Sequence, residues 1–227
     1  MKTKNIKIAL VGQPNVGKSM LINSISNSKL KVGNFSGVTV EKKEVNFKYK
    51  DFNIQIIDLP GTYSLSNYSI EEKIVKNFLK NESYDIILNV LDSTNLQRNL
   101  LLTSDILELN KKIVIALNMS DEAEKENIFI DNKKLSSYLK KPCVKVSAMQ
   151  KKGITELLDT IIKSYLDNQE IFNQFYINPN PSHDEILNQK FAFVKKISQD
   201  CIVIKKENKK SFTEKIDSIL MHNFFGL

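Results

Sequence analysis

Ile6-Lys-Ile-Ala-Leu-Val-Gly-Gln-Pro-Asn-Val-Gly-Lys-Ser19 is the stretch that decides the fold of this chain. Its apolar beginning is typical of a buried strand, and Leu21-Ile22 after it indicates a helix. Between the two, the spacing Gly12-x4-Gly17-Lys18-Ser19 fits the P-loop pattern, in which a glycine-bounded loop joins a strand to a helix. The sequence therefore predicts a phosphate-binding loop. The alternative is a glycine-rich turn that fits by chance, and such a turn would lack the companion motifs described below.

Each residue type in this loop has a physical role at an anion. Glycines at positions 12 and 17 let the backbone approach a phosphate closely, so that N–H groups and the helix N-terminus face it. We expect Lys18 to face the β- and γ-phosphate oxygens and the Ser19 hydroxyl to hold Mg²⁺. The candidate phosphate site is Gly12, Gln13, Pro14, Asn15, Val16, Gly17, Lys18 and Ser19.

Composition is that of a globular protein with one domain of ordinary size and an extension. The 227 residues are 41% hydrophobic and 26% charged, and no apolar run approaches the ~18 residues of a membrane span. The net charge is +7, but the basic residues are spread out and all except Arg98 are lysines, so we expect no nucleic-acid partner. Cys143, Cys201, His183 and His222 are isolated, which implies neither a zinc site nor a disulfide framework.

Strand and helix patterns alternate over residues 1–167. Apolar strands are predicted at 6–11, 54–57, 86–91, 113–117 and 144–146, with a further strand through Val45, Phe47 and Tyr49. Helical periods are predicted behind Ser69-x-x-Glu72, at 96–110, around 135–139 and from Gly153 onwards. This alternation predicts a doubly wound, mostly parallel α/β sheet with ligand at the edge where the strands' carboxyl ends gather.

Residues 168–227 are predicted to form a small all-α extension. A polar linker contains Pro179 and Pro181, and Ser182-x-x-Glu185 then begins a helix with Phe191, Val194 and Ile197 facing inward. Ser211-x-x-Glu214 begins a second helix. We therefore predict two domains, at 1–167 and 168–227.

Two further loops carry phosphate and metal chemistry. Gly37-Val38-Thr39 lies in a glycine-containing loop, the candidate first switch, and Thr39 can reach Mg²⁺ and the γ-phosphate. Asp58-Leu59-Pro60-Gly61 follows a strand and is the candidate second switch. Asp58 can hold a metal-bound water, and the Gly61 N–H can sense the γ-phosphate. Ser19, Thr39 and Asp58 together are the candidate Mg²⁺ residues.

The last two loops predict recognition of guanine. Asn118-Met119-Ser-Asp121 follows a buried strand, and the Asp121 carboxylate can accept both N–H groups of the guanine edge and so reject adenine. Ser147-Ala148-Met149 follows the next strand and can complete the base pocket through backbone N–H groups. An isolated N-x-x-D is more often an ordinary loop, but its place after the other motifs predicts a Ras-like GTPase that uses GTP and GDP.

The five loops resemble the translation-factor-like branch of small GTPases and, more narrowly, the N-terminal cytosolic domain of ferrous iron transport protein B, the FeoB family. The resemblance lies in residues 32–41, 58–64, 92–100, 191–194 and 213–222, and in Asn118-Met119, where most GTPases have Lys in the second position. Departures from the family pattern are Gln13 for its usual Asn, Phe35 for its Trp and Ser36 for its Pro or Ala.

The resemblance implies a GTPase domain that drives or gates Fe²⁺ uptake through a transmembrane pore of the same full-length protein, beginning where this chain ends. It implies a soluble domain at the cytoplasmic face of the bacterial inner membrane. Small cytosolic Feo proteins and further copies of the chain are implied partners. Turnover should be slow, because Thr62 stands where Ras-like proteins carry a water-orienting Gln. The resemblance also implies a K⁺ site formed by Asn15 and the carbonyls of Gly33 and Phe35.

Two alternatives remain open at this point. A ribosome-associated, RNA-binding GTPase would share the phosphate loop, but outside the nucleotide loops the only glycines are Gly153 and Gly226, so no G-x-x-G clamp for RNA follows the GTPase domain. The second alternative is a regulatory module that binds GTP without hydrolysing it. Phosphate release in a single turnover distinguishes that module from an enzyme.

Overall fold

The computed structural model describes residues 4–26, 31–35, 38–66, 68–167 and 182–205. Ser36, Gly37 and the predicted helix after Ser211 lie outside these ranges. The strands are β1 (Lys4–Gly12), β2 (Lys31–Asn34), β3 (Glu41–Tyr49), β4 (Phe52–Asp58), β5 (Ile86–Asp92), β6 (Ile113–Asn118), β7 (Ile128–Ile130), β8 (Cys143–Lys145) and β9 (Ile202–Ile204). The α-helices are α1 (Lys18–Ile25), α2 (Ile70–Asn81), α3 (Leu96–Leu107), α4 (Ser120–Lys125), α5 (Asn132–Leu139), α6 (Ile154–Leu166) and α7 (His183–Cys201).

Seven strands form one sheet in the order β2-β3-β4-β1-β5-β6-β8. Strand β1 lies at its centre and is parallel to both β4 and β5, whereas β3 runs antiparallel to β4. The carboxyl ends of β1, β4, β5, β6 and β8 therefore meet at one edge of the sheet. This arrangement confirms the predicted mostly parallel α/β fold and places the five sequence motifs along that edge.

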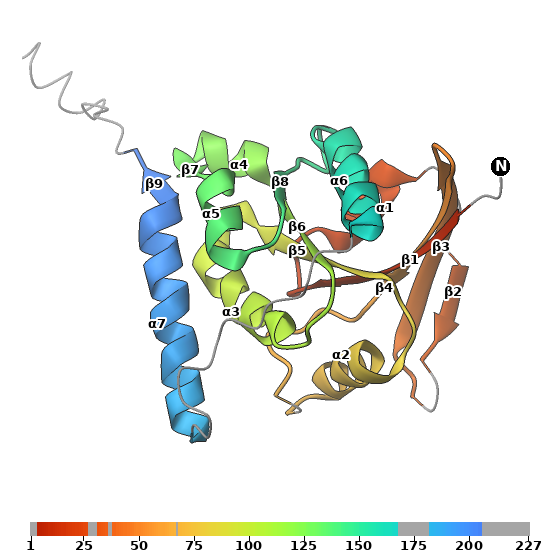
Figure 1. The fold of residues 1–227 in the computed structure, drawn as a ribbon, viewed down its shortest axis with the longest axis horizontal. Coiled ribbons are helices and arrows are strands. Elements are labelled where there is room, and N and C mark those ends of the chain that lie inside the picture. Colours follow the sequence, from red (N-terminus) through yellow and green to blue (C-terminus); the bar gives the residue numbers. More distant parts are fainter. Residues whose placement is uncertain (1–3, 27–30, 36–37, 67, 168–181, 206–227) are drawn as a thin grey trace, which may run out of the picture.

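Helices cover both faces of the sheet, as Figure 1 shows, with α1 and α6 on one side and α2 and α3 on the other. Successive residues of a strand point to opposite faces, so β1 contributes to two cores. Ile8 and Leu10 are fully buried under α1 and α6, and Ala9 and Val11 are fully buried on the side of α2 and α3. Because both faces are covered, β5 and β6 are apolar almost throughout, as their sequences predict.

The extension contributes one described helix, α7, which packs on α3 and α5 (Figure 1). Ser182 and Glu185 form the predicted capping box at its start. Val194 and Ile197 are buried as predicted, but the prediction for Phe191 is wrong, since 49% of its surface is exposed. The buried positions 194, 197 and 201 recur with the helical period; Phe191 lies at one margin of this packed face and stays exposed, while Phe193 at the other margin is partly buried against the core.

A short antiparallel ladder also joins this extension to the main domain. Strand β9, which follows α7 directly, pairs with β7, and Asp131 donates its backbone N–H to the Cys201 carbonyl. The predicted boundary at residue 167 stays a prediction. Within the described ranges, no helix has both the length and the apolar composition that a bilayer span requires.

Candidate nucleotide site

The phosphate loop takes the conformation that its glycines allow. Strand β1 ends at Gly12 and α1 begins at Lys18, with Gly17 in the left-handed region at φ 82°. A Cβ atom on Gly17 would lie 2.5 Å from the Asn118 amide nitrogen, so only glycine fits this position without displacing that side chain. The start of α1, where backbone N–H groups are unpaired, therefore opens towards the front of the loop.

A hollow of about 320 Å³ lies in front of this loop. Its lining residues are Asn15, Gly17, Lys18, Ser19, Met20, Glu41, Lys43, Asp58, Leu59, Pro60 and Gly61. Residues of the phosphate loop and of the second switch therefore line the same hollow. A Cβ on Gly61 would lie 3.0 Å from the Pro14 backbone, which shows how closely the two loops approach. Sequence reasoning missed Met20, Glu41 and Lys43, and the alternation of β3 residues was the signal that could have found the last two.

The buried carboxylate of Asp58 is the candidate cation ligand of this site. It is 8% exposed, and its Oδ1 atom is buried without a hydrogen-bond partner among the described residues. Burial raises the pKa of Asp58, while the charges of Lys18 and Lys43 lower it. An unpaired carboxylate oxygen in a hollow that the Ser19 side chain also lines suits a hard divalent ion. The residues present thus fit Mg²⁺, which Ser19 and Asp58 would hold.

Lys18 interacts electrostatically with both Asp58 and Lys43. Its Nζ atom donates to the Gly12 carbonyl at 3.4 Å, a weak contact that a phosphate oxygen can replace. Burial lowers the pKa of Lys18, the Asp58 carboxylate raises it, and the charge of Lys43 lowers it. A phosphate in the hollow would add negative charge beside Lys18 and stabilise its ammonium form.

The described residues of the first switch, Val38 and Thr39, do not line this hollow. Thr39 is exposed, and neither Thr39 nor Gly33 nor Phe35 is among the described residues that line it. Gly33 pairs with Lys42 in the β2–β3 ladder. Phe35 is buried with its ring edge-on to Phe78, and its carbonyl accepts the Val38 N–H at 3.3 Å. Of the predicted Mg²⁺ and K⁺ ligands, the structure therefore places Ser19, Asp58 and Asn15 at the hollow but not Thr39, Gly33 or Phe35.

The base loops are tied to the phosphate loop through Asn118. Its amide nitrogen donates to the Val16 carbonyl at 2.9 Å, and its Oδ1 atom accepts the Ala148 N–H at 3.1 Å. Met119 next to it adopts a positive φ of 58° as the N-cap of α4. One buried side chain thus fixes the spacing between the phosphate loop and the Ser147-Ala148-Met149 loop.

Asp121 lies in the first turn of α4 and is held by a residue that sequence reasoning missed. Its Oδ2 atom accepts from the Gln150 side chain at 3.0 Å, and the Gln150 backbone N–H donates to the Ser147 hydroxyl at 3.1 Å. Ser147 is buried, whereas Met149 is 69% exposed. The predicted guanine-reading carboxylate is therefore at the surface, oriented by the neighbouring base loop.

The second switch continues into a loop with further contacts. The Thr62 hydroxyl is buried and donates to the Ser64 carbonyl at 2.8 Å. The Arg98 guanidinium lies 4.8 Å from the Tyr63 ring centre, and the Gln13 side chain donates to the Arg98 carbonyl at 2.8 Å. Gln13 thus joins the phosphate loop to α3 beside the second switch, a role not evident from its position in the motif.

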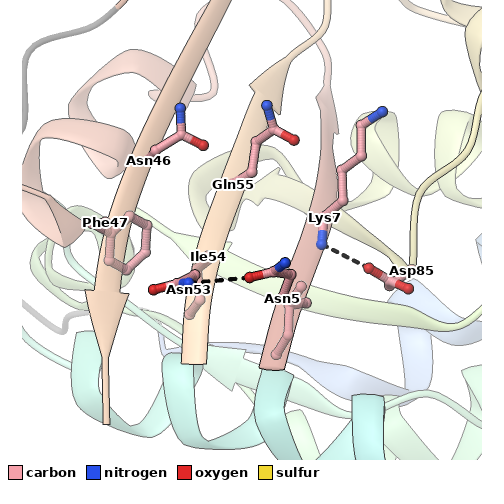
Figure 2. Close-up of a pocket in the computed structure, with 9 residues that line it drawn as sticks. Asn5, Lys7, Asn46, Phe47, Asn53, Ile54, Gln55 and Asp85 are labelled. Carbon is pink, nitrogen blue, oxygen red and sulfur yellow. Dashed lines mark hydrogen bonds between the residues drawn. The ribbon is translucent and has the colours of Figure 1, made fainter. Parts of the chain in front are cut away.

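A second hollow, of about 560 Å³, lies at the opposite end of the strands and is separate from this site (Figure 2). Amide side chains of β1, β3 and β4 line it, and Asn53 donates to Asn5 at 3.1 Å. The Lys7 backbone N–H donates to Asp85 at 2.7 Å. Because the hollow is at the amino ends of the parallel strands, none of the phosphate- or base-loop residues contributes to it.

A phosphate loop after the central strand, an acidic residue at the end of β4 and an Asn-x-x-Asp loop after β6 together define a domain of the P-loop GTPase class. Comparison with known families narrows this class. Residues 6–161 match the model of the family described as ferrous iron transport protein B. The chain therefore belongs to the FeoB family.

Similar proteins span nearly the whole chain. The Fe(2+) transporter FeoB of Campylobacter jejuni is 48% identical over 227 residues, covering 99% of this chain and 36% of that protein. The FeoB of Helicobacter pylori strain J99 is 49% identical over 235 residues, covering 99% of this chain and 35% of that protein. The chain thus spans about a third of the length of these relatives.

Solved structures agree with this assignment. The cytosolic domain of T. maritima FeoB superposes with a TM-score of 0.80 in a GDP form, at 30% identity, covering 88% of this chain and 100% of that one. Its GMPPNP form gives a TM-score of 0.81 at 30% identity, covering 87% and 99% of the two chains. The cytosolic domain of L. pneumophila FeoB gives 0.78 at 30% identity, covering 88% and 100%.

Proposed function

We propose that this chain binds GTP and GDP at the hollow in front of its phosphate loop and slowly hydrolyses GTP to GDP and phosphate. The observation that carries this proposal is the convergence of Lys18, Ser19 and Asp58 on one hollow, with an unpaired buried oxygen on Asp58. The GDP and GMPPNP forms of the similar T. maritima domain support the choice of nucleotide.

The chain's own residues supply most of the chemistry. Lys18 and the backbone N–H groups at the start of α1 would bind the phosphate oxygens and stabilise charge that develops on them. Ser19 and Asp58, joined by Thr39 once the first switch closes, would hold Mg²⁺, which when bound neutralises the β- and γ-phosphate oxygens. Thr62 is turned into its own loop, so it does not orient the attacking water, and slow turnover is expected.

We also propose that Asn15 holds a K⁺ ion that stimulates hydrolysis, with the Gly33 and Phe35 carbonyls joining it in the GTP-bound state. Asn15 lines the hollow already, and the Phe35 carbonyl would have to give up its bond from Val38. Hydrolysis should be faster in K⁺ than in Na⁺ at equal ionic strength. Asn15→Ala should abolish that difference and leave GDP affinity within about twofold. Identical rates in the two salts for the unaltered chain would rule the ion out.

At the level of the whole protein, we propose a role in Fe²⁺ uptake at the cytoplasmic face of the bacterial inner membrane. The greater length of the FeoB relatives supports a transmembrane pore as the main partner. A Porphyromonas gingivalis relative is described as a fusion of Fe(2+) transport protein A with FeoB, which supports a small Feo protein as a second partner. Self-association remains a prediction. Membership in an iron-transport family favours this function over an RNA-binding one.

The direct test has two parts. A single-turnover measurement of phosphate release separates a GTPase from a module that only binds GTP. Uptake of labelled Fe²⁺ into vesicles that carry the full-length transporter should then fall when Lys18 is changed to Ala, because phosphate binding is lost. Normal uptake with a variant that no longer binds nucleotide would show that the domain does not gate transport.

A further inference from the structure

Lys43 is a second lysine of the phosphate hollow, placed there by strand pairing. In the antiparallel β3–β4 ladder Lys43 is directly opposite Asp58, and the two side chains lie on the same face of the sheet. Lys43 lines the hollow together with Lys18 and Ser19. Its side chain is 36% exposed and contacts the Glu41 carboxylate at 3.5 Å, a long and partly solvated ion pair. Glu41 also lines the hollow, but because this ion pair is long and solvated it offsets the charge of Lys43 only in part.

The electrostatics of the hollow show where that charge acts. Lys43 interacts with both Asp58, whose pKa it lowers, and Lys18, whose pKa it also lowers. Two lysines thus surround one buried carboxylate that has an unpaired oxygen. A magnesium ion placed near Ser19 and Asp58 would bring two more positive charges to the same small region, next to an ammonium that is already there.

We propose that Lys43 partly substitutes for Mg²⁺ when the ion is absent. Its ammonium group then neutralises Asp58 and attracts the nucleotide phosphates. When Mg²⁺ binds, the same group repels the ion. This inference rests on the proposed nucleotide and Mg²⁺ site. It makes Lys43 a positioning residue that acts through Asp58 and the phosphates. Its consequence is a weak dependence of GDP binding on Mg²⁺, so that the domain retains GDP moderately well without the ion.

The sign of each effect follows from charge alone. Removing the Lys43 charge takes an attractive cation away from GDP, so GDP binds less tightly without Mg²⁺. The same change removes a repulsion from Mg²⁺, so the ion binds the GDP complex more tightly. At saturating Mg²⁺ the two effects offset each other. A lysine that only bound phosphate would weaken GDP equally with and without the ion.

The experiment measures the affinity of fluorescently labelled GDP, with excess chelator and across a Mg²⁺ titration. Lys43→Met keeps the length of the side chain and removes its charge. We expect this variant to bind GDP about tenfold more weakly in chelator, whereas its GDP affinity at saturating Mg²⁺ should change less than about twofold. The Mg²⁺ concentration that gives half of the increase in GDP affinity should be about tenfold lower. Lys43→Arg restores the charge and should behave as the unaltered chain.

Lys42→Met is the matched control. Lys42 precedes Lys43 in β3 and points to the opposite face, where it pairs with Glu44 at 2.7 Å. Its replacement by Met removes the same charge as the Lys43 variant does. It should leave both affinities unchanged. Equal weakening by Lys43→Met with and without Mg²⁺, or the same response from Lys42→Met, would overturn the inference. If Mg²⁺ has no effect on GDP affinity in the unaltered chain, the proposed Mg²⁺ site itself fails, a distinguishable result.

Discussion

Among single residues, Asn118 makes contacts that reach furthest across the site. It joins Val16 of the phosphate loop to Ala148 of the base loop, and it packs against the one position, Gly17, where a Cβ would displace it. Both bonds are buried, and a buried donor or acceptor that loses its partner costs about 1–3 kcal/mol. Asn118 is therefore a structural residue of the site as well as a candidate for contact with the base.

We expect Asn118→Ala to lower the free energy of unfolding of the nucleotide-free chain by about 2 kcal/mol, because the Val16 carbonyl and the Ala148 N–H both lose their partner. Chemical denaturation without nucleotide measures this. Ser24→Ala in α1 serves as the control and should change stability less, because the half-buried Ser24 hydroxyl makes one local hydrogen bond, to the Leu21 carbonyl, and leaves no fully buried group unpaired. An unfolding midpoint for Asn118→Ala equal to that of the unaltered chain would show that the two hydrogen bonds of Asn118 do not stabilise the fold.

Asp121 presents the opposite case, since its carboxylate is at the surface and bonds only to the Gln150 side chain among the described residues. Asp121→Asn should leave stability within about 0.5 kcal/mol. It should weaken the binding of GTP and favour the binding of xanthine nucleotides, because the two-point hydrogen bond to guanine is lost and a complementary one to xanthine is gained. Competition binding with GDP and XDP checks this. Unchanged GDP affinity would contradict the assignment of Asp121 to the base.

Between elements, Asp105 of α3 connects the second-switch loop to α7. Its Oδ2 atom accepts the Leu65 N–H at 2.9 Å, and its Oδ1 atom pairs with Lys190 of α7 at 2.6 Å. Lys190 also pairs with Glu108 at 2.7 Å and is only 14% exposed. Burial lowers the pKa of Lys190, but the hydrogen bonds to the two carboxylates outweigh it and the net shift is upward, so the ammonium is charged at neutral pH.

Lys190→Met should therefore destabilise the contact between α3 and α7 by about 1–3 kcal/mol, because it leaves the largely buried Asp105 without its counter-charge. Asp105 should then hold the Leu65 backbone less firmly, and GDP affinity should fall. Lys195→Met changes an exposed lysine of the same helix and is the matched control. Amide exchange at Leu65 measures the effect directly. Protection at Leu65 that is unchanged in Lys190→Met would show that α7 does not act on this loop.

At the scale of the molecule, α7 and β9 cover apolar surface of the main domain. Val194, Ile197 and Cys201 are almost fully buried in the core on the side of α3 and α5. Val194 and Ile197 each contribute about 1.5–3 kcal/mol when buried. Residues 182–205 are therefore packed against the described part of the main domain, whether or not a domain boundary at 167 holds in the full-length protein.

Ending the chain after Asp167 should lower the melting temperature by several degrees. We also predict that this truncation weakens the binding of GDP more than that of GTP, because the Lys190 contact that supports the second-switch loop is removed with α7. Titration of labelled GDP and of a non-hydrolysable GTP analogue, with and without the tail, tests this. The Val194→Ala variant of the full chain separates lost packing from lost coupling, since it leaves Lys190 in place. Equal affinities for both chains would remove the idea of coupling.

The sequence by itself determined the central sheet and the identity of the nucleotide loops. Strands β5 and β6 are apolar almost throughout because both faces of the sheet are covered, and this leaves a strong signal in a short window. Gly17, Lys18, Asp58 and Asn118 were found because their chemistry requires fixed residue types at fixed spacing. The capping box at Ser182 was equally readable, since its two partners are three residues apart.

Only the tertiary structure decided which distant residues meet. Strands β7 and β9 are short, and nothing local indicates that segments more than seventy positions apart pair. The exposure of Phe191 and the partial burial of Phe193 depend on which side of α7 rests on α3 and α5. Lys43 reaches the phosphate hollow only because the β3–β4 register sets it opposite Asp58, and a shift by one residue would turn it to the other face.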